Sequence, residues 1–244
     1  MSNVYAIPAA KDLIAPNPYP GRGIILGTTP DGRYAVFAYF IMGRSDNSRN
    51  RVFTEFPDGS ICTEPYDLSR VKDPSLIIYA PVRRVGNHVI VTNGDQTDTV
   101  RDGILAGKSF SEALESREFE PDAPNLTPRI SGMMSFADAS FTYQMSILKS
   151  ADPEGTACNR FTYKYAPIKG LGHFIHTYME DGNPLPTFTG EPERVAIPND
   201  IDAFTKELWE SLNEDNKISL AVRYYALADG GETVLSRMIN KYSK

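Results

Sequence analysis

The chain has 244 residues, of which 41% are hydrophobic and 23% are charged, so it can bury the substantial core of an ordinary globular protein. Its formal net charge of -6 argues against a nucleic-acid partner, because binding a polyanion normally needs a basic face. No apolar run approaches the roughly 20 residues that cross a bilayer, and the N-terminus lacks an export-signal pattern, so we expect no membrane association and a cytoplasmic location.

The first hundred residues have the pattern of antiparallel strands joined by tight turns. Segments rich in Ile, Val, Tyr and Phe and bounded by turn formers predict strands at residues 22–28, 33–42, 76–85 and 88–93. Asp-Gly pairs within 29–33 and 56–60 predict two further turns, and Gly86 with Asn87 predicts a hairpin between the last two strands.

The pattern then changes to helix and returns to strand. Apolar residues at helical spacing predict one or two helices within 97–117, with Ser109 or Ser111 as a cap. Later strands are predicted at 128–136, 141–150, 157–166, 172–179 and 218–227, and an amphipathic helix at 200–212. The segment 232–242 fits a helix or a strand. This order predicts an α+β layered fold in a single domain, 1–244, with 1–18 as an N-terminal arm.

Common metal-binding patterns are weak in this chain. Cys62 and Cys158 lie far apart and outside any CxxC spacing, which suggests neither a disulfide framework nor a zinc site. His173 and His176 would face opposite sides of a strand, so they are poor joint ligands. We therefore expect no metal.

Three polar segments follow apolar strands and are candidates for a binding site. In GRSDNSRNR (43–51), guanidinium groups can grip a phosphate while Ser45, Asn47 and Ser48 donate hydrogen bonds; a solvated turn is the alternative. In VTNGDQTD (91–98), a strand ends and a predicted helix begins, where backbone N–H groups favour anions. A simple cap is the alternative there, but a cap needs one side chain and this segment offers five.

The third segment, FEPDAPNLTPRIS (119–131), is a loop stiffened by three prolines. Such a loop suits either a pre-ordered binding surface or a rigid connector. Together, the three segments would fit a pocket for a phosphorylated, purine-like small molecule.

The three segments resemble the archaeal-type inosine monophosphate cyclohydrolases, enzymes that close the second ring of the purine skeleton. The resemblance runs from about residue 19 to 149 through GRSDNSRNR, LIIYAPVRRVGNHVIVTNGDQTD and FEPDAPNLTPRI, in the family's order. Residues 150–244 are less well matched and form the C-terminal half of the same predicted domain. Within them, GLGHFIHTYMEDGNPLPTFTGEP is similar to an extension in bacterial relatives.

The resemblance implies a four-layer αββα sandwich with mainly antiparallel sheets, as in N-terminal-nucleophile hydrolases, but without an N-terminal nucleophile in use. It implies dehydrative closure of 5-formamidoimidazole-4-carboxamide ribonucleotide to inosine monophosphate. The carboxamide nitrogen attacks the formyl carbon, so the substrate must be positioned and the oxyanion on the formyl oxygen stabilised. No metal or redox cofactor is required. The implied partner is a small purine-precursor ribonucleotide, and a homo-oligomer is left open.

By motif position, the resemblance makes Tyr79 a proton donor or relay, Arg44 a charge stabiliser and Glu120 a further catalytic candidate. Tyr79 is expected in the middle of a strand, where the alternative is a core aromatic with a satisfied hydroxyl. The implied substrate-binding residues are Ser45, Asn47, Arg49, Asn93, Asp95, Gln96, Thr97, Asp98, Asn125, Thr127 and Arg129. Of these, the arginines are assigned to the phosphate or ribose, and the residues from Asn93 to Asp98 with Asn125 and Thr127 to the base and sugar.

Two other functions remain open from the sequence. Removal of Met1 would leave Ser2 at the N-terminus, where its own α-amino group could serve as base for an amidohydrolase of the same fold. Alternatively, the chain could be a non-catalytic protein that binds purine nucleotides without turning them over.

Overall fold

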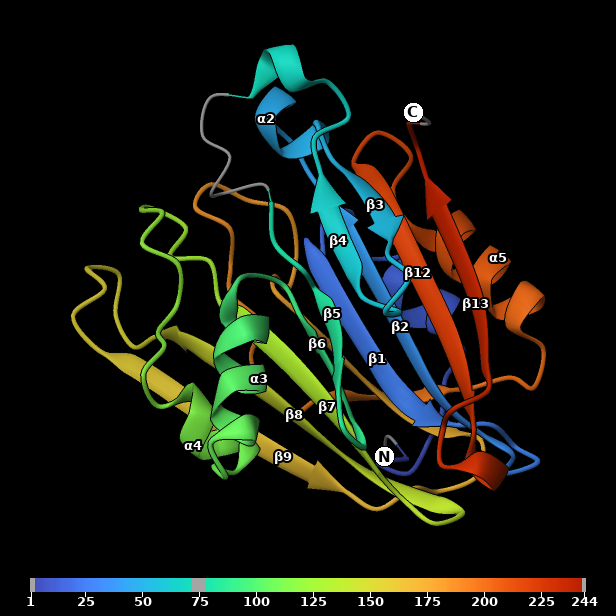
Figure 1. Ribbon diagram of the computed structural model, residues 1–244. Helices are drawn as coiled ribbons and strands as arrows, with labels where there is room; N and C mark the ends of the chain where they lie inside the picture. Colours follow the sequence, from blue (N-terminus) through green and yellow to red (C-terminus); the bar gives the residue numbers. More distant parts are fainter. Residues whose placement is uncertain (1–2, 72–77, 243–244) are drawn as a thin grey trace.

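A computed structural model describes residues 3–71 and 78–242 of the chain (Figure 1). Ser2, considered above as a nucleophile, lies outside these ranges.

The strands of the described residues form two antiparallel sheets. The six-stranded sheet has the order β11 (Glu193–Ala196), β10 (Leu171–His176), β1 (Arg22–Thr28), β2 (Tyr34–Met42), β12 (Lys217–Ala226) and β13 (Val234–Asn240). The seven-stranded sheet has the order β3 (Val52–Glu55), β4 (Ile61–Glu64), β5 (Val82–Val85), β6 (His88–Thr92), β7 (Arg129–Ala137), β8 (Ser140–Ser150) and β9 (Cys158–Tyr165).

The two sheets pack face to face. The position of β2 in this arrangement explains why its sequence carries no charge. Successive side chains of a strand point to opposite faces. Phe37 and Tyr39 join the core between the sheets, whereas Val36 and Phe40 join a second core on the outer face of the six-stranded sheet. Because both faces of β2 are buried, an apolar run replaces the usual alternation of apolar and polar residues.

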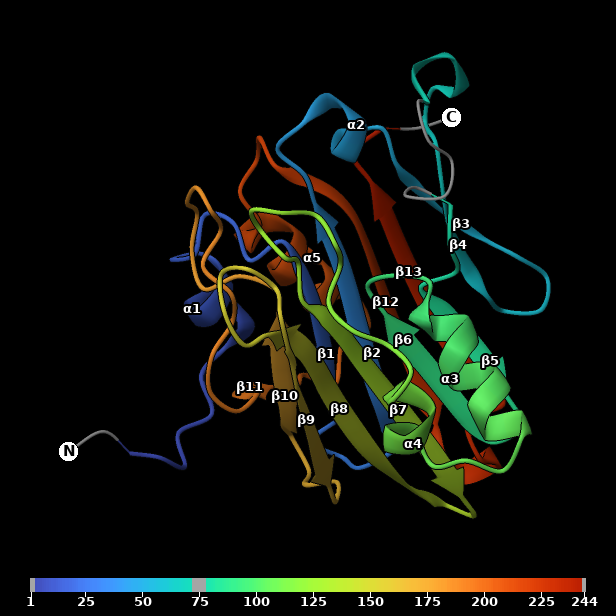
Figure 2. The ribbon, with the colours of Figure 1, turned by 90° about the vertical axis from the view of Figure 1, so that its left-hand side faces the viewer.

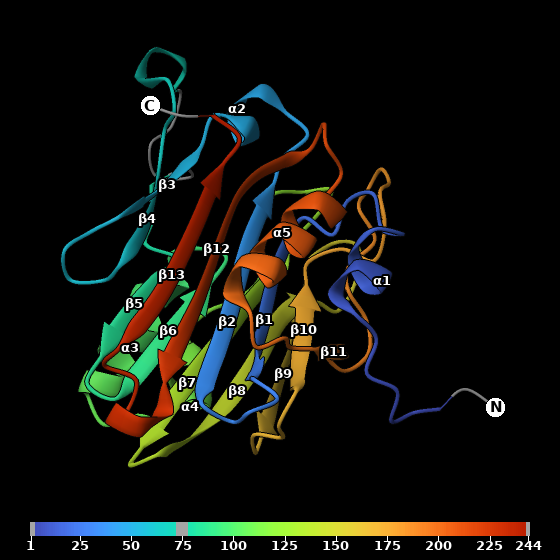
Figure 3. The ribbon, with the colours of Figure 1, turned by 90° about the vertical axis from the view of Figure 1, so that its right-hand side faces the viewer.

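Helices cover the outer face of each sheet (Figures 2 and 3). On the seven-stranded sheet, α3 (Gln96–Leu105) and α4 (Phe110–Leu114) bury Val100, Phe110 and Leu114 against β6, β7 and β8. On the six-stranded sheet lie α1 (Ala10–Ile14) and α5 (Ile201–Ser211), and α5 buries its Phe204 and Leu208 against the sheet. Full burial of one such side chain contributes about 1.5–3 kcal/mol. None of the helices in the described residues has the length and apolar character to span a bilayer.

The α+β class, the antiparallel pairing and most predicted elements are confirmed. The predicted region 97–117 contains two helices, and Ser109 caps the second in a capping box with Glu112. Segment 232–242 contains a strand, β13. The polar segment 43–51 contains a single helical turn, α2 (Asp46–Arg49), which the sequence pattern did not predict. The short strands β3, β4 and β11, helix α1, and the 3-10 turns η1 (Leu68–Arg70) and η3 (Leu227–Asp229) were also not predicted.

The predicted strand at 76–85 is wrong over residues 78–81. Residues 76 and 77 lie outside the described ranges, and strand β5 begins only at Val82. Tyr79 therefore lies in an extended connection and not in the middle of a strand. Pro81 has no N–H group to donate to a strand ladder. Before it, the carbonyl of Tyr79 accepts a hydrogen bond from the backbone N–H of Thr63 at 2.9 Å.

Candidate active site

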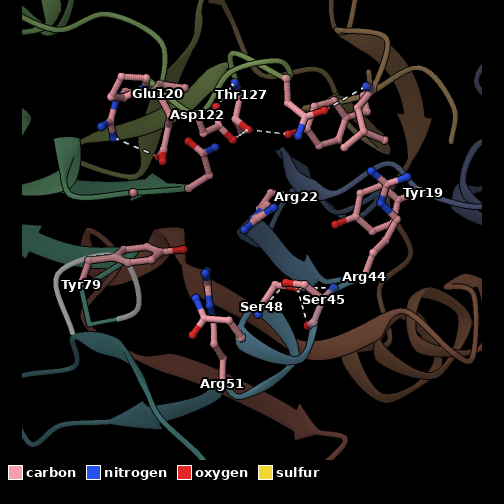
Figure 4. Close-up of a pocket in the computed structure, with 18 of the residues that line it drawn as sticks. Tyr19, Arg22, Arg44, Ser45, Ser48, Arg51, Tyr79, Glu120, Asp122 and Thr127 are labelled. Atoms are coloured by element: carbon pink, nitrogen blue, oxygen red, sulfur yellow. Dashed lines mark hydrogen bonds and ion pairs between the residues drawn. The ribbon is translucent and has the colours of Figure 1, made fainter. Parts of the chain in front are cut away.

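A cavity of about 610 Å³ lies where strand ends of both sheets meet (Figure 4). Antiparallel pairing of Arg22 with Ile41, and of Gly23 with His176, brings the start of β1 beside the ends of β2 and β10. In the other sheet, pairing of Thr92 with Ser131 brings the end of β6 beside the start of β7. The polar segments that follow or precede these strand ends are thereby gathered around one space.

Ten of the predicted site residues line this cavity: Arg44, Ser45, Asn47, Tyr79, Asn93, Asp95, Glu120, Asn125, Thr127 and Arg129. The remaining four, Arg49, Gln96, Thr97 and Asp98, are not among its lining residues in the described part of the chain. The three segments quoted from the sequence therefore converge, as the resemblance requires.

The segment 43–51 is shaped by α2 and held at the rim of the cavity. Ser45 caps the helical turn by accepting a hydrogen bond from the backbone N–H of Ser48 at 3.2 Å, and the Ser48 hydroxyl accepts one from the Ser45 N–H at 3.0 Å. The guanidinium of Arg49 turns away from the cavity lining and donates to the Gly43 carbonyl at 3.1 Å and to Asn216 at 3.3 Å. Arg49 therefore fixes the shape of the segment.

Arg44 is exposed at the same rim and is engaged by the segment that follows β10. Its Nη1 lies 2.5 Å from the Asp181 carboxylate and donates to the Gly182 carbonyl at 2.9 Å. Its guanidinium also lies 5.0 Å from the centre of the Tyr19 ring, within reach of a cation–π contact. The positive charge of Arg44 is thus partly neutralised before any ligand enters.

The opposite wall carries charged groups that neutralise one another. Arg129 Nη1 lies 2.8 Å from Asp95 and 3.4 Å from Glu120, and Arg117 forms a second ion pair with Asp95. Burial works to raise the pKa of Asp95, but the hydrogen bonds and charges of Arg117 and Arg129 outweigh it and leave the pKa lowered. Gly94 leaves room for this network, because a Cβ there would come within 2.7 Å of Arg129 Nη1. Asp95 precedes α3 but makes no side-chain cap.

Asn93 joins the two strand ends beneath this wall. Its buried amide donates to the Pro128 carbonyl at 2.9 Å, and its Oδ1 accepts from the Ile130 N–H at 2.9 Å and from Gln96 at 2.8 Å. These bonds satisfy most of the amide, so Asn93 and Gln96 hold the 93–96 turn against β7. Because this turn is fixed, the part of the cavity wall that it forms is fixed as well.

Thr97 and Asp98 serve the framework on the helix side. The Thr97 hydroxyl lies 2.6 Å from that of buried Thr92, and Asp98 accepts from Arg83 at 2.5 Å and from Arg101 at 2.8 Å. Both contacts tie the first turn of α3 to the sheet below it.

The loop 119–131 and the segment after β10 form one continuous wall. The Thr127 hydroxyl lies 2.5 Å from Asp122 and 2.6 Å from the Tyr178 hydroxyl, and Asn125 accepts from the Leu185 N–H at 3.1 Å. Through these contacts, Tyr178 and Leu185 become part of the lining. The less well matched C-terminal half thus completes the cavity.

Two arginines of the lining, Arg22 and Arg51, form no close ion pair with a carboxylate within 3–71 and 78–242, although the charge of Glu120 acts on Arg51. Arg51 is 7% exposed, and its Nε is buried without a hydrogen-bond partner. Burial lowers the pKa of Arg51, and the positive charge of Arg22 lowers it further. Burial also acts to lower the pKa of Arg22, but Coulomb interactions with Tyr19, Tyr79 and neighbouring tyrosines leave it raised. An anion between the two guanidinium groups would relieve their mutual repulsion.

Tyr79 points its hydroxyl into the space that Arg51 also enters (Figure 4). Its backbone is fixed by Thr63, whose hydroxyl donates to the Tyr79 carbonyl at 3.1 Å. Its hydroxyl lies 3.2 Å from that of Tyr39 on β2. The Tyr79 hydroxyl therefore lies in the same cavity as the guanidinium groups of Arg22 and Arg51.

Several lining residues are not among the site residues that the resemblance implies: Tyr19, Arg22, Ser48, Arg51, Gly94, Pro121, Asp122, Tyr178 and Leu185. Arg51 and Ser48 lie inside a segment that was singled out, so a signal for them existed. Arg22 directly precedes an apolar strand, in the same way as the arginines of 43–51 directly follow one. Tyr178 and Leu185 lie where the family resemblance assigns no residue.

The structure also separates the HxxH pair. His173 lies 2.8 Å from the Tyr143 hydroxyl, while His176 lies 2.8 Å from the Tyr178 carbonyl on the other side of β10. In the described residues, no group of three or more His, Cys, Asp and Glu side chains could hold a metal ion.

Comparison with known proteins gives one consistent result. A family model described as IMP cyclohydrolase-like protein matches residues 19–230. An IMP cyclohydrolase of Methanococcus aeolicus is 30% identical over 165 residues, which are 66% of this chain and 74% of the relative. An IMP cyclohydrolase of Methanococcus maripaludis is 33% identical over 51% of this chain and 62% of its own, and one of Methanopyrus kandleri is 32% identical over 46% and 57%.

Proposed function

The chain belongs to the IMP cyclohydrolase-like family, and on this premise we propose that it closes 5-formamidoimidazole-4-carboxamide ribonucleotide to inosine monophosphate in purine biosynthesis. Relatives named IMP cyclohydrolase at 30% to 33% identity support the reaction. A cavity of about 610 Å³ has the size of a site for one mononucleotide. The ligand partner is a small nucleotide, and the proposal includes a cytoplasmic location.

The proposed reaction is an addition followed by loss of water. The carboxamide nitrogen forms a bond to the formyl carbon, and negative charge develops on the formyl oxygen. That oxygen then leaves as water, taking one proton that came from the carboxamide nitrogen and one from the formamido nitrogen. Because an amide is a weak nucleophile, the protein must align the two groups and stabilise the oxyanion.

Tyr79 is the proposed donor of one proton to the departing oxygen, and it recovers a proton from the formamido nitrogen. Arg22 and Arg51 provide the positive charge for the oxyanion, because no carboxylate in the described chain neutralises them. Glu120 faces this space from the opposite wall and is the proposed acceptor for the carboxamide proton. It passes this proton to the departing oxygen, which restores the carboxylate and completes the water molecule.

The rim supplies the proposed contacts to the phosphate and sugar. Arg44, with Ser45 and Asn47, faces the entrance from the α2 segment, and we assign these residues to the phosphate. Asp95, Asn125, Thr127 and Arg129 line the remaining wall and are assigned to the ribose and base. Arg49, Asn93, Gln96, Thr97 and Asp98 are assigned to holding these segments in place.

The fold proposed for the chain is a single domain with the four-layer αββα order, of the N-terminal-nucleophile hydrolase type. Helices α1 and α5 on one outer face, and α3 and α4 on the other, support this order. The uncompensated pair Arg22 and Arg51 beside Tyr79, in one cavity, is the observation that carries the functional assignment.

Incubation of the purified protein with the formamido nucleotide tests the proposal. We expect ultraviolet absorbance to show formation of the purine ring, and chromatography to identify inosine monophosphate. Nucleotide binding without turnover would favour the non-catalytic alternative. Mass spectrometry of the active protein tests the amidohydrolase alternative, because full activity with Met1 retained excludes a mechanism that starts from Ser2.

A further inference from the structure

Tyr39 is a buried tyrosine that lies behind Tyr79, on the side away from the cavity. It lies on β2, is 0% exposed, and is not part of the cavity lining. Its ring stacks on Phe53 with centroids 5.5 Å apart, which fixes the direction of its hydroxyl. That hydroxyl lies 3.2 Å from the hydroxyl of Tyr79, so the two phenols form a hydrogen-bonded pair.

Tyr39 differs from an ordinary core tyrosine in the partner of its hydroxyl. Tyr224, equally buried on β12, donates to the backbone carbonyl of Pro198 at 2.8 Å, as a satisfied core hydroxyl does. The Tyr39 hydroxyl instead meets a side chain that lines the cavity. Its neighbours on the same face of β2, Phe37 and Ile41, carry no polar group, so packing alone does not require a hydroxyl here.

Tyr39 remains a neutral donor throughout the working range of pH. Burial raises the pKa of Tyr39 well above its ordinary value, and the neighbouring Tyr79 raises it as well. The guanidinium groups of Arg22 and Arg51 act in the opposite direction without reversing the shift. A neutral O–H next to a phenol that loses its proton can only donate to it.

Building on the proposed function, we infer that Tyr39 is a positioning residue that donates a hydrogen bond to Tyr79 while Tyr79 gives its proton to the departing formyl oxygen. The O–H bond of Tyr79 breaks and a bond from that hydrogen to the leaving oxygen forms, which leaves a phenolate on Tyr79. Tyr39 keeps its own proton throughout. The phenolate recovers a proton from the formamido nitrogen, so the pair returns to its starting state.

The backbone of Tyr79 is held from the other direction, which makes the hydroxyl contact effective. Thr63 exchanges hydrogen bonds with the Tyr79 carbonyl and N–H, at 3.1 Å and 3.2 Å from its hydroxyl. With the backbone fixed by Thr63 and the phenol end fixed by Tyr39, the reactive hydroxyl has one favoured position.

A double-mutant cycle on the full chain tests this inference. We expect Tyr39→Phe to lower kcat by about 10- to 100-fold, as for loss of one hydrogen bond to a charged oxygen, with KM and affinity for inosine monophosphate nearly unchanged. Tyr79→Phe should lower kcat by about 10²- to 10³-fold. The double variant should match Tyr79→Phe alone, because Tyr39 acts only through Tyr79. Tyr224→Phe is the matched control and should retain wild-type kcat.

The inference would be overturned if the kcat losses of the two single variants multiplied in the double variant. It would also be overturned if Tyr39→Phe kept wild-type kcat. If Tyr39→Phe does not fold, 3-fluorotyrosine at position 39 keeps the shape and strengthens the donor. The alkaline limb of the kcat profile should then move to lower pH, because a stronger donor favours the Tyr79 phenolate; an unchanged limb would overturn the role. A wild-type protein that forms no inosine monophosphate would refute the proposed function itself, independently of any variant.

Discussion

Two cavities formed by the described residues are rich in arginine, and they differ in their suitability for an anion. The second cavity, of about 230 Å³, lies between β5 and β12 and is lined by Arg83, Arg84 and Arg223. Each of these has a carboxylate: Asp98 at 2.5 Å, Glu232 at 2.5 Å and Glu55 at 2.9 Å, respectively. In the first cavity, Arg22 and Arg51 have no such partner among the described residues.

The difference shows that arginine content alone does not identify a phosphate or oxyanion site. A guanidinium paired with a carboxylate already has its charge and its fork of donors occupied. One that is buried without a counter-charge is costly for the empty protein and favourable once an anion arrives. Substitutions at paired and unpaired arginines should therefore have different effects on turnover.

Replacing Arg51 removes a buried charge that forms no close ion pair in the described chain. We expect Arg51→Met to lower kcat/KM by about 10²- to 10³-fold, the range for losing one stabilising group at a developing oxyanion. The kcat/KM of Arg51→Lys should lie between those of the wild type and Arg51→Met, because lysine keeps the charge but lacks the planar guanidinium fork. Steady-state kinetics with the formamido nucleotide measure both, and wild-type kcat/KM in Arg51→Met would remove Arg51 from the mechanism.

Arg223 is the matched arginine of the second cavity, buried and paired with Glu55. Arg223→Met should lower the free energy of unfolding by about 2 kcal/mol, as for loss of a hydrogen bond to a charged group. Turnover should stay at the wild-type level. Urea denaturation and the cyclisation assay separate these two effects. A selective loss of turnover in a stable Arg223→Met variant would mean that the second cavity also takes part.

Arg49 tests the difference between a ligand contact and support for the α2 segment. Its guanidinium holds Gly43 and Asn216, so Arg49→Ala should loosen the segment that carries Ser45. We expect binding of inosine monophosphate to weaken by about 1 kcal/mol, roughly five-fold, with kcat retained. Isothermal titration calorimetry gives the affinity. A loss comparable to that of Arg51→Met would indicate direct contact with the ligand.

Asp181 tests whether a paired arginine at the rim can be released. The Arg44–Asp181 ion pair is solvent-exposed and therefore weak. Asp181→Asn should free Arg44 for the phosphate and tighten nucleotide binding by at most about 1 kcal/mol. The gain should shrink at high salt, because exposed charges are screened. Weaker binding in this variant would show that Asp181 itself contacts the ligand or holds Arg44 in its productive position.

The sequence predicted most of the fold because its signals are local. The apolar run of β2, the Asp-Gly turns and the Ser109 cap each depend on neighbours within a few residues. Short elements such as β3 and α2, four residues each, contain too few positions to show a period. Tyr79 was assigned to a strand because aromatic and apolar neighbours surround it, while the effect of Pro81 on the ladder was not taken into account.

The sequence also predicted that three polar segments converge, but not which charges remain free. Arg44 is paired with Asp181, which lies in a part of the chain without an assigned role. Arg129 is paired with Asp95, 34 positions away. Whether a guanidinium is neutralised depends on such contacts between distant segments, and these follow only from the packing of the two sheets.

The cavity wall draws on both sheets, from Tyr19 before β1 to Leu185 after β10. Its residues are spread over more than half of the sequence, so the site forms only when both sheets are in place. Occupancy and folding are therefore thermodynamically linked: a nucleotide at a hundred times its Kd would add about 2.7 kcal/mol to the stability of the native state.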